Sequence, residues 1–94
     1  MSKRLISHEL QNEFSFEVLI SLLRNGEQNK QVLYAGISPS TTTLGRRVNE
    51  LEELGLVKVD KQPLKYNVHF VSLTDRGREV AEKILEIEDI LSQQ

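Results

Sequence analysis

The sequence predicts a mainly α-helical protein with one small β-hairpin, which places it in the α+β class. Apolar residues recur at helical spacing in three separate stretches, whereas residues 66–73 alternate between two faces as a β-strand does. At 94 residues, of which 38% are hydrophobic, the chain can bury one core and is too short for two domains. We therefore expect a single domain over residues 1–94, with an N-terminal segment (1–13), a central unit (14–73) and a C-terminal helix (74–94).

The first two helices are predicted from apolar spacing and from the residues that end them. Residues 14–23 place their apolar side chains at helical spacing, with Ser15 as the cap and Asn25-Gly26 at the end. A shorter helix is expected within residues 27–34, and Gly36 would close it in a left-handed conformation.

A third helix is expected at about residues 39–54. Ser38 suits its N-cap, and Pro39 suits its first position because the N–H that proline lacks would be unpaired there. At 100° per residue one apolar stripe forms, and it consists of Leu44, Val48 and Leu51. The residues that point away from this stripe are Thr42, Arg46, Asn49 and Glu53. Gly45 lies in mid-helix, where glycine costs about 1 kcal/mol relative to alanine. Close approach of another backbone, of protein or of DNA, would explain why a glycine stands there.

Two strands and a long helix are expected after Gly55, which ends the third helix. The strands cover residues 56–59 and 66–73, and the loop between them contains Pro63 and lysines. Thr74 caps a final helix that runs to about residue 91, and Asp75 lies near the positive end of its dipole.

This order of elements, with a tight turn between the second and third helices, is the plan of a winged helix-turn-helix with a three-helix core, a wing and a long C-terminal helix. Residues 37–57, ISPSTTTLGRRVNELEELGLV, resemble the recognition-helix signature of winged-helix transcription regulators, and residues 73–77, LTDRG, are similar to the segment that leads out of their wing. Over residues 14–91 the pattern most resembles the HxlR-like and MarR-like groups. The resemblance implies a recognition helix (about 39–54) in the major groove of double-stranded DNA and a wing (about 60–66) on the phosphate backbone.

The charge of the chain is unevenly distributed. Its formal net charge is −2, and the acidic residues are concentrated in residues 74–94. Residues 38–48 contain Arg46 and Arg47 and no acid, and residues 61–71 contain Lys61 and Lys65 and no acid. Two small basic patches therefore lie within an acidic protein. On charge alone, solvated surface and nucleic-acid contact explain these patches equally well.

Candidate DNA contacts are the short polar side chains and the cations of these patches, because such groups read base edges and phosphates. They are Ser40, Thr41, Thr42, Arg46, Arg47 and Asn49 in the third helix, with Lys61 and Lys65 in the wing. Arg46 faces away from the core stripe and suits a guanine edge, whereas Arg47 lies to the side, where phosphate is expected. The alternatives are that Thr43 faces the core, that the other hydroxyls only satisfy the helix start, and that the lysines serve solubility.

The last helix carries a candidate dimer interface. Apolar residues at spacings of four, three and four form a coiled-coil seam, with a further apolar residue beside it. The candidate interface consists of Val80, Ile84, Ile87, Ile90 and Leu91. Such a helix is longer than a small core can cover, so its far half would meet a second subunit of a homodimer. The alternative is that it folds back over the first helix and the segment LISHEL.

The sequence shows no sign of catalysis, of a cofactor or of a metal site. It has no cysteine, and His8 and His69 lack the partner spacing of a metal site or a general base. The longest apolar run, residues 18–23, is far shorter than the ~20 residues that cross a membrane. The first residues, MSKRLISHEL, carry no export signal. We expect no enzyme, no membrane contact and a cytoplasmic location, and no residue indicates a small-molecule effector.

Three functions stay open on the sequence. The favoured one is a dimeric, sequence-specific DNA-binding transcription regulator. The second is a winged-helix protein-interaction module in a larger assembly, which the acidic total charge supports. The third is a small enzyme or ligand carrier. Two arginines at an acid-free helix start favour the first, since an interaction module has no particular need for them.

Overall fold

A computed structural model describes residues 5–61 and 68–93 of the chain. Its elements, in chain order, are the 3-10 helix η1 (Ile6–Gln11), α1 (Ser15–Asn25), β1 (Gln28–Asn29), α2 (Lys30–Ala35), α3 (Thr41–Glu53), β2 (Val57–Lys61), β3 (His69–Leu73) and α4 (Asp75–Ser92). The mainly helical class with a small sheet is confirmed, as is the order of helices, hairpin and long last helix that defines a winged helix.

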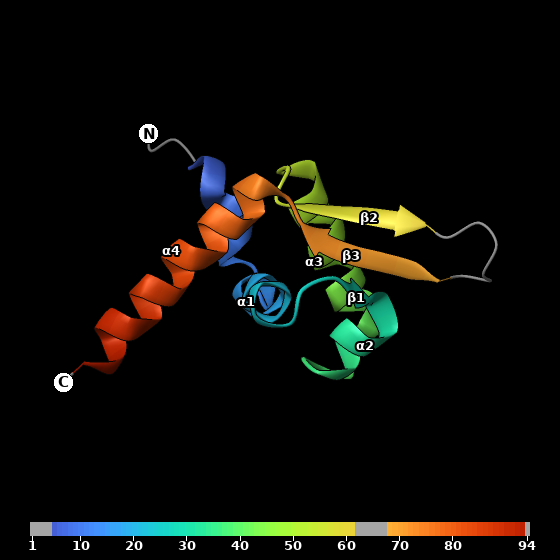
Figure 1. Cartoon of the computed structure of the whole chain (residues 1–94), viewed down its shortest axis with the longest axis horizontal. Helices are drawn as coiled ribbons and strands as arrows, with labels where there is room; N and C mark the ends of the chain where they lie inside the picture. The colour runs from blue at the N-terminus through green and yellow to red at the C-terminus, as the bar shows by residue number, and fades with distance from the viewer. Residues whose placement is uncertain (1–4, 62–67, 94) are drawn as a thin grey trace.

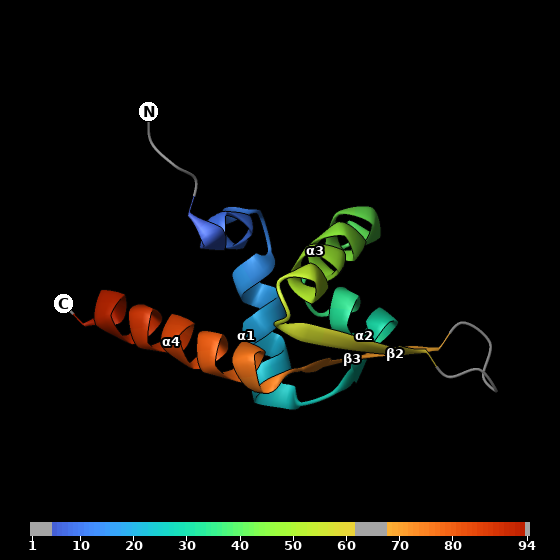
Figure 2. The same ribbon diagram turned by 90° about the horizontal axis from the view of Figure 1, so that it is seen from above.

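The hairpin and the last helix leave the helical centre in opposite directions. Figure 1 shows α1 end-on between α4 on one side and the β2–β3 hairpin on the other. Seen from above, α2 and α3 lie on the same side of the sheet (Figure 2). The far half of α4 therefore extends beyond the other helices in both views.

The sheet has three antiparallel strands in the order β1-β3-β2. Its central residue is Val71, which pairs with Gln28 of β1 and with Val59 of β2. The sequence predicts only the hairpin and assigns residues 28 and 29 to a helix, which is wrong. Two residues are too few to show an alternating pattern, so only the pairing with β3 makes this segment a strand.

The core lies between the helices and the inner face of the sheet. Its buried hydrophobic residues are Val18, Leu19, Leu22, Leu33, Leu44, Val48, Leu51, Leu56, Val57, Val71, Ala81 and Ile84. The predicted stripe of α3 is confirmed, because Leu44, Val48 and Leu51 are all fully buried. Each large apolar side chain buried in this way contributes about 1.5–3 kcal/mol relative to an exposed one.

The start of α1 differs from the prediction. Phe14, not Ser15, occupies the N-cap, and its φ of 72° is left-handed. Ser15 is buried, and its hydroxyl donates to the carbonyl oxygen of Glu9 at 3.1 Å. The unpredicted helix η1 supplies that acceptor, so the Ser15 side chain ties the preceding segment to α1 instead of capping the helix.

The segment around the turn between α2 and α3 also differs. Gly36 has a φ of −78°, so the expected left-handed cap is wrong. The turn is closed instead by the backbone N–H groups of Ile37 and Ser38, which both donate to the carbonyl oxygen of Tyr34 at 3.0 Å. Helix α3 begins at Thr41 with Ser40 as N-cap, two residues later than expected from Ser38 and Pro39. The Ser38 hydroxyl is used within this turn, where it accepts from the backbone N–H of Ser40 at 3.1 Å.

Hydrogen bonds tie the end of α3 to the start of α4. Gly55 ends α3 with a φ of 77°, as glycine readily does. The Thr74 backbone N–H donates to the Leu56 carbonyl oxygen at 3.0 Å, and its hydroxyl donates to the Gly55 carbonyl oxygen at 2.6 Å. The predicted cap is confirmed, since the same hydroxyl oxygen accepts from the Gly77 N–H at 3.0 Å. A Cβ on Gly77 would lie 2.7 Å from the Leu56 carbonyl carbon, so this contact leaves no room for a side chain.

We predict that Gly77→Ala destabilises the protein by about 3 kcal/mol, because the added methyl group overlaps backbone that cannot move without breaking the cap. Urea unfolding followed by circular dichroism measures the loss. Gly36→Ala is the matched control, since its Cβ would approach other atoms only to 3.7 Å. Equal stability of the two variants would contradict the proposed steric role of Gly77.

Candidate nucleic-acid interface

The exposed face of α3 carries most of the candidate contacts. Thr42, Arg46 and Asn49 are exposed, on the side of the helix opposite Leu44, Val48 and Leu51. The predicted division of this helix into an apolar and a polar face is therefore confirmed. Nothing from the described residues covers Arg46, which forms neither an ion pair nor a hydrogen bond with any of them.

Only some of the hydroxyl groups at the start of α3 form hydrogen bonds with described residues. The Ser40 side chain forms no capping bond to the helix backbone, and its hydroxyl donates to the Thr43 hydroxyl oxygen at 2.9 Å. Thr43 is half-buried, whereas Thr41 and Thr42 are exposed. The free polar groups at this helix end are thus those of Thr41 and Thr42.

Arg47 does not lie where the sequence predicts. It is only 8% exposed, and its Nη1 donates to Glu50 Oε1 at 2.6 Å. At 100° per residue its side chain leaves α3 beside the core stripe, so the pairing with Glu50 uses the charge that was expected to meet phosphate. Arg47 Nε is buried with no hydrogen-bond partner among the described residues.

The Arg47–Glu50 pair also holds the N-terminal segment. Asn12 follows η1, and its Nδ2 donates to the same Glu50 Oε1 at 3.1 Å. Sequence reasoning missed this link, because residues 38 positions apart carry no shared pattern. The carboxylate of Glu50 therefore connects α3 to the chain that precedes α1.

Gly45 faces α2. The nearest atom to an ideal Cβ at this position is the Tyr34 hydroxyl oxygen, at 3.8 Å. The expectation that another protein backbone approaches Gly45 is wrong for the described residues. What lies there instead is the tip of a half-buried side chain from α2.

The two lysines predicted to contact DNA from the wing fall outside the described side chains. Lys65 lies outside the described residues, and Lys61 ends β2 with a side chain that is also outside them. Lys58, one position into β2, is exposed on the outer face of the sheet and was not among the predicted contacts.

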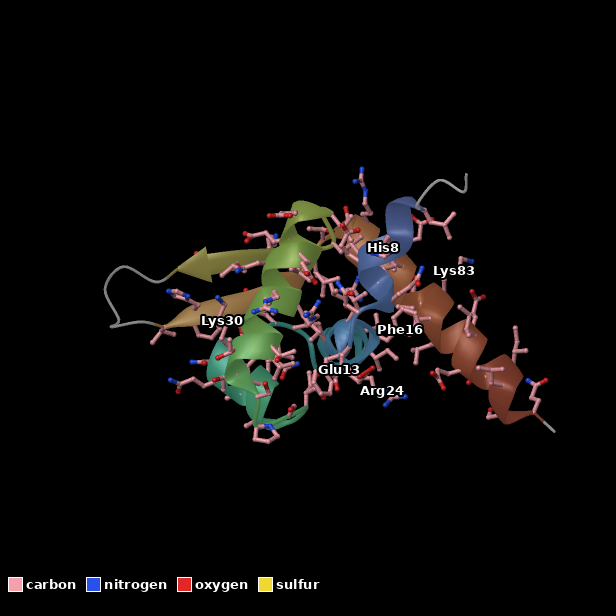
Figure 3. The ribbon with its side chains drawn as sticks, turned by 180° about the vertical axis from the view of Figure 1, so that it is seen from behind. His8, Glu13, Phe16, Arg24, Lys30 and Lys83 are labelled. Carbon is pink, nitrogen blue, oxygen red and sulfur yellow. The ribbon has the colours of Figure 1, made fainter. Side chains whose placement is uncertain are left out.

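Helix α4 divides into two halves. Ile84 is 3% exposed and belongs to the core, whereas Ile87, Ile90 and Leu91 are 47%, 66% and 64% exposed. Helix α4 thus packs on α1, as the alternative predicted, and leaves these three apolar side chains of its far half exposed. An open groove of about 450 Å³ runs beside the apolar residues of α4. It is lined by Leu10, Gln11, Phe16, Glu79, Val80, Lys83, Ile84 and Ile87. Figure 3 labels two of these lining residues, Phe16 on α1 and Lys83 on α4.

Other kinds of site are not seen in the part of the chain that the structure describes. Within residues 5–61 and 68–93, no group of three or more His, Asp or Glu side chains is placed to hold a metal ion. None of the described helices is both long and apolar enough to span a membrane.

We predict that Glu50→Ala destabilises the protein by about 1–3 kcal/mol, because it leaves the buried Arg47 guanidinium without its acceptor. Denaturant unfolding measures the loss. Glu53→Ala removes the same charge from the exposed face of α3 and should change stability by less than about 0.5 kcal/mol. The double variant Arg47→Met/Glu50→Ala should recover most of the stability, and a failure to recover would contradict a penalty for an unpaired charge.

Comparison with known proteins places the fold among transcription regulators. No protein-family model matches the sequence, and no curated protein matches it either. A transcriptional regulator homologue from Pyrococcus horikoshii OT3 is 26% identical, with a TM-score of 0.77 over 93% of this chain and 91% of that one. A possible HxlR family transcriptional factor from Thermoplasma volcanium GSS1 is also 26% identical, with a TM-score of 0.75 over 97% and 84%.

A larger protein, AbfR, has the same fold. Reduced AbfR bound to DNA is 24% identical with a TM-score of 0.72, and disulfide-formed AbfR is 22% identical with a TM-score of 0.77. This chain spans 62% of the length of AbfR in both structures. The resemblance found in the sequence is confirmed: the chain has the winged-helix fold of the HxlR-like and MarR-family transcriptional regulators.

Proposed function

We propose that this protein binds double-stranded DNA in a sequence-specific manner and regulates transcription as a homodimer. In this proposal α3 enters the major groove, and the loop between β2 and β3 lies on the phosphate backbone. The observation that carries the proposal is Arg46, an exposed cation with no partner among the described residues, at the centre of the polar face of the helix that we propose as the recognition helix.

The composition of this face favours DNA over protein as the partner. Thr42, Arg46 and Asn49 are the residue types that hydrogen-bond to base edges. The acids of α3 are Glu50, Glu52 and Glu53, which all lie at its C-terminal end, and Glu50 is neutralised by Arg47. The N-terminal part of α3 is therefore the part that a duplex would meet without charge repulsion. Proposed contacts are Thr41, Thr42, Arg46 and Asn49, with Ser40 at the helix start and Lys61 and Lys65 in the wing.

Dimer formation is proposed through the far half of α4. Ile87, Ile90 and Leu91 form a ridge, and the groove that contains Leu10, Phe16 and Val80 lies along the same helix. A surface with both a ridge and a groove can pair with its own copy across a two-fold axis. Two winged helices would then contact two half-sites, which increases both affinity and site length.

Binding to a random-sequence duplex at ~50 mM and ~200 mM salt tests the proposed DNA contact. Fluorescence anisotropy should detect binding that weakens steeply as salt rises, because lysine and arginine displace counterions from phosphates. A chain that binds no duplex at low salt would contradict DNA binding and favour the interaction module.

We predict that Arg46→Ala costs about 1–3 kcal/mol on a preferred duplex selected from a random pool and removes discrimination at one base position, because a bidentate contact to guanine is lost. Competition binding measures this effect. Lys65→Ala is the comparison, since loss of a phosphate contact should weaken binding to all sequences and reduce the salt dependence. If Arg46→Ala weakened all sequences equally, Arg46 would contact phosphate instead.

We predict that Ile87→Asp gives a folded monomer with weak, non-specific DNA binding, because a carboxylate in an apolar interface costs several kcal/mol. Sedimentation and circular dichroism measure assembly and folding separately. Ile87→Leu should keep the dimer, and Ile84→Asp should unfold the chain, since Ile84 is in the core. A wild-type chain that is monomeric at micromolar concentration, or an Ile87→Asp chain that unfolds, would contradict the proposed dimer.

A further inference from the structure

The side chain of Tyr34 reaches α3 at Gly45, the one position of that helix that has no side chain. Its hydroxyl oxygen is 3.8 Å from the position that a Cβ on Gly45 would occupy. At 100° per residue, Gly45 lies about 40° from Asn49 and about 60° from Thr42 around the helix, so it borders the polar face of α3. We infer that the Tyr34 hydroxyl donates a hydrogen bond to a phosphate oxygen of bound DNA, beside the gap that Gly45 leaves. This inference rests on the proposed function.

The hydroxyl is free to make such a bond. It forms no hydrogen bond with any described residue, and it is not among the buried polar atoms that lack a partner. Water therefore still reaches it, although the ring is half-buried. Burial raises the pKa of Tyr34 above its usual value of 10.0, so the group stays protonated and can donate. A tyrosine hydroxyl that is held by its ring and has no internal partner loses little freedom when it binds an external acceptor.

The position favours phosphate over a base edge. Arg46 lies at the centre of the polar face, whereas Gly45 lies at its border on the side of α2. A helix in the major groove directs its central residues to the bases and has its borders near the sugar-phosphate backbone. Tyrosine is among the side chains that bind phosphate oxygens and thereby fix the orientation of the protein on the duplex.

Tyr34→Phe tests the inference, because it removes only the hydroxyl oxygen. We expect about a tenfold loss of affinity on both a preferred and a random duplex, since a bond to a charged acceptor is lost. The dependence on salt should not change, because the lost donor is neutral and releases no counterion. The melting temperature should stay the same, because the hydroxyl has no partner within the fold. Ser72→Ala is the control, because it removes a half-buried hydroxyl of β3 that also has no hydrogen-bond partner among the described residues.

Gly45→Ala tests whether the Tyr34 hydroxyl reaches DNA through the gap at Gly45. A methyl group there would be in ordinary contact with the Tyr34 hydroxyl, so the fold tolerates it. If the inference is right, the methyl occupies the gap through which the hydroxyl reaches the duplex. Adding Tyr34→Phe to Gly45→Ala should therefore cost much less than tenfold, since both changes remove one contact. A full further tenfold loss would show that the hydroxyl does not act through the gap and would overturn the inference.

The remaining outcomes separate the inference from the proposed function. Equal affinity of wild type and Tyr34→Phe, a loss confined to the preferred duplex, or a loss accompanied by a lower melting temperature would each overturn the phosphate contact while DNA binding stands. A wild-type chain that binds no duplex would overturn the proposed function and this inference with it.

Discussion

The contact between the Leu56 carbonyl group and the first turn of α4 sets the relative positions of α3, the strands β2 and β3, and α4. Leu56 joins α3 to β2, and Thr74 joins β3 to α4, so their backbone hydrogen bond holds four elements at one point. Thr74 adds a bond from its hydroxyl to Gly55 and accepts one from Gly77. The close approach is possible only because Gly77 has no side chain, while Gly55 allows the reversal that brings Leu56 into reach. A loss at this junction would therefore disturb the geometry of α3 and of the strands β2 and β3 together.

The two adjacent arginines of α3 show how one residue step changes a role. Arg46 leaves the helix toward solvent, whereas Arg47, 100° further round, lies against the core and forms an ion pair with Glu50. The buried pair gains a further hydrogen bond from Asn12, so its contribution is to hold the segment before α1 against α3. A charge of this kind adds nothing to the field that DNA would meet. Counting arginines in a basic segment therefore overstates the cations available to a partner, and their angular position on the helix decides which of them count.

Periodicity and capping residues were enough to predict most of the fold. The stripe of Leu44, Val48 and Leu51, the cap at Thr74 and the end of α3 at Gly55 all follow from local chemistry, and the structure confirms each of them. The errors fall where distant segments decide the outcome. β1 is a strand only because it pairs with β3, and the buried Ser15 hydroxyl bonds to a segment with no recognisable pattern. In the candidate site, the exposed positions of Thr42, Arg46 and Asn49 were predictable from the helical period. The meeting of Tyr34 with Gly45 was not, because it depends on how α2 and α3 pack.

An acidic net charge is compatible with a DNA-binding face when the acids are distant from it. The acids of α4 are Asp75, Glu79, Glu82, Glu86, Glu88 and Asp89, and all of them are exposed. Figure 1 shows that this helix extends away from the hairpin, on the opposite side of α1. At physiological salt, charges are screened beyond about 8 Å, so a duplex on α3 and the wing would respond mainly to the residues beside it. The same acids would also limit how two copies of α4 can pair. Repulsion between the carboxylates is avoided only when Ile87 and Leu91 are buried in the interface and the carboxylates stay in water. The acids that make the net charge of the chain negative, and so unfavourable for DNA binding, thus favour one geometry of the proposed dimer.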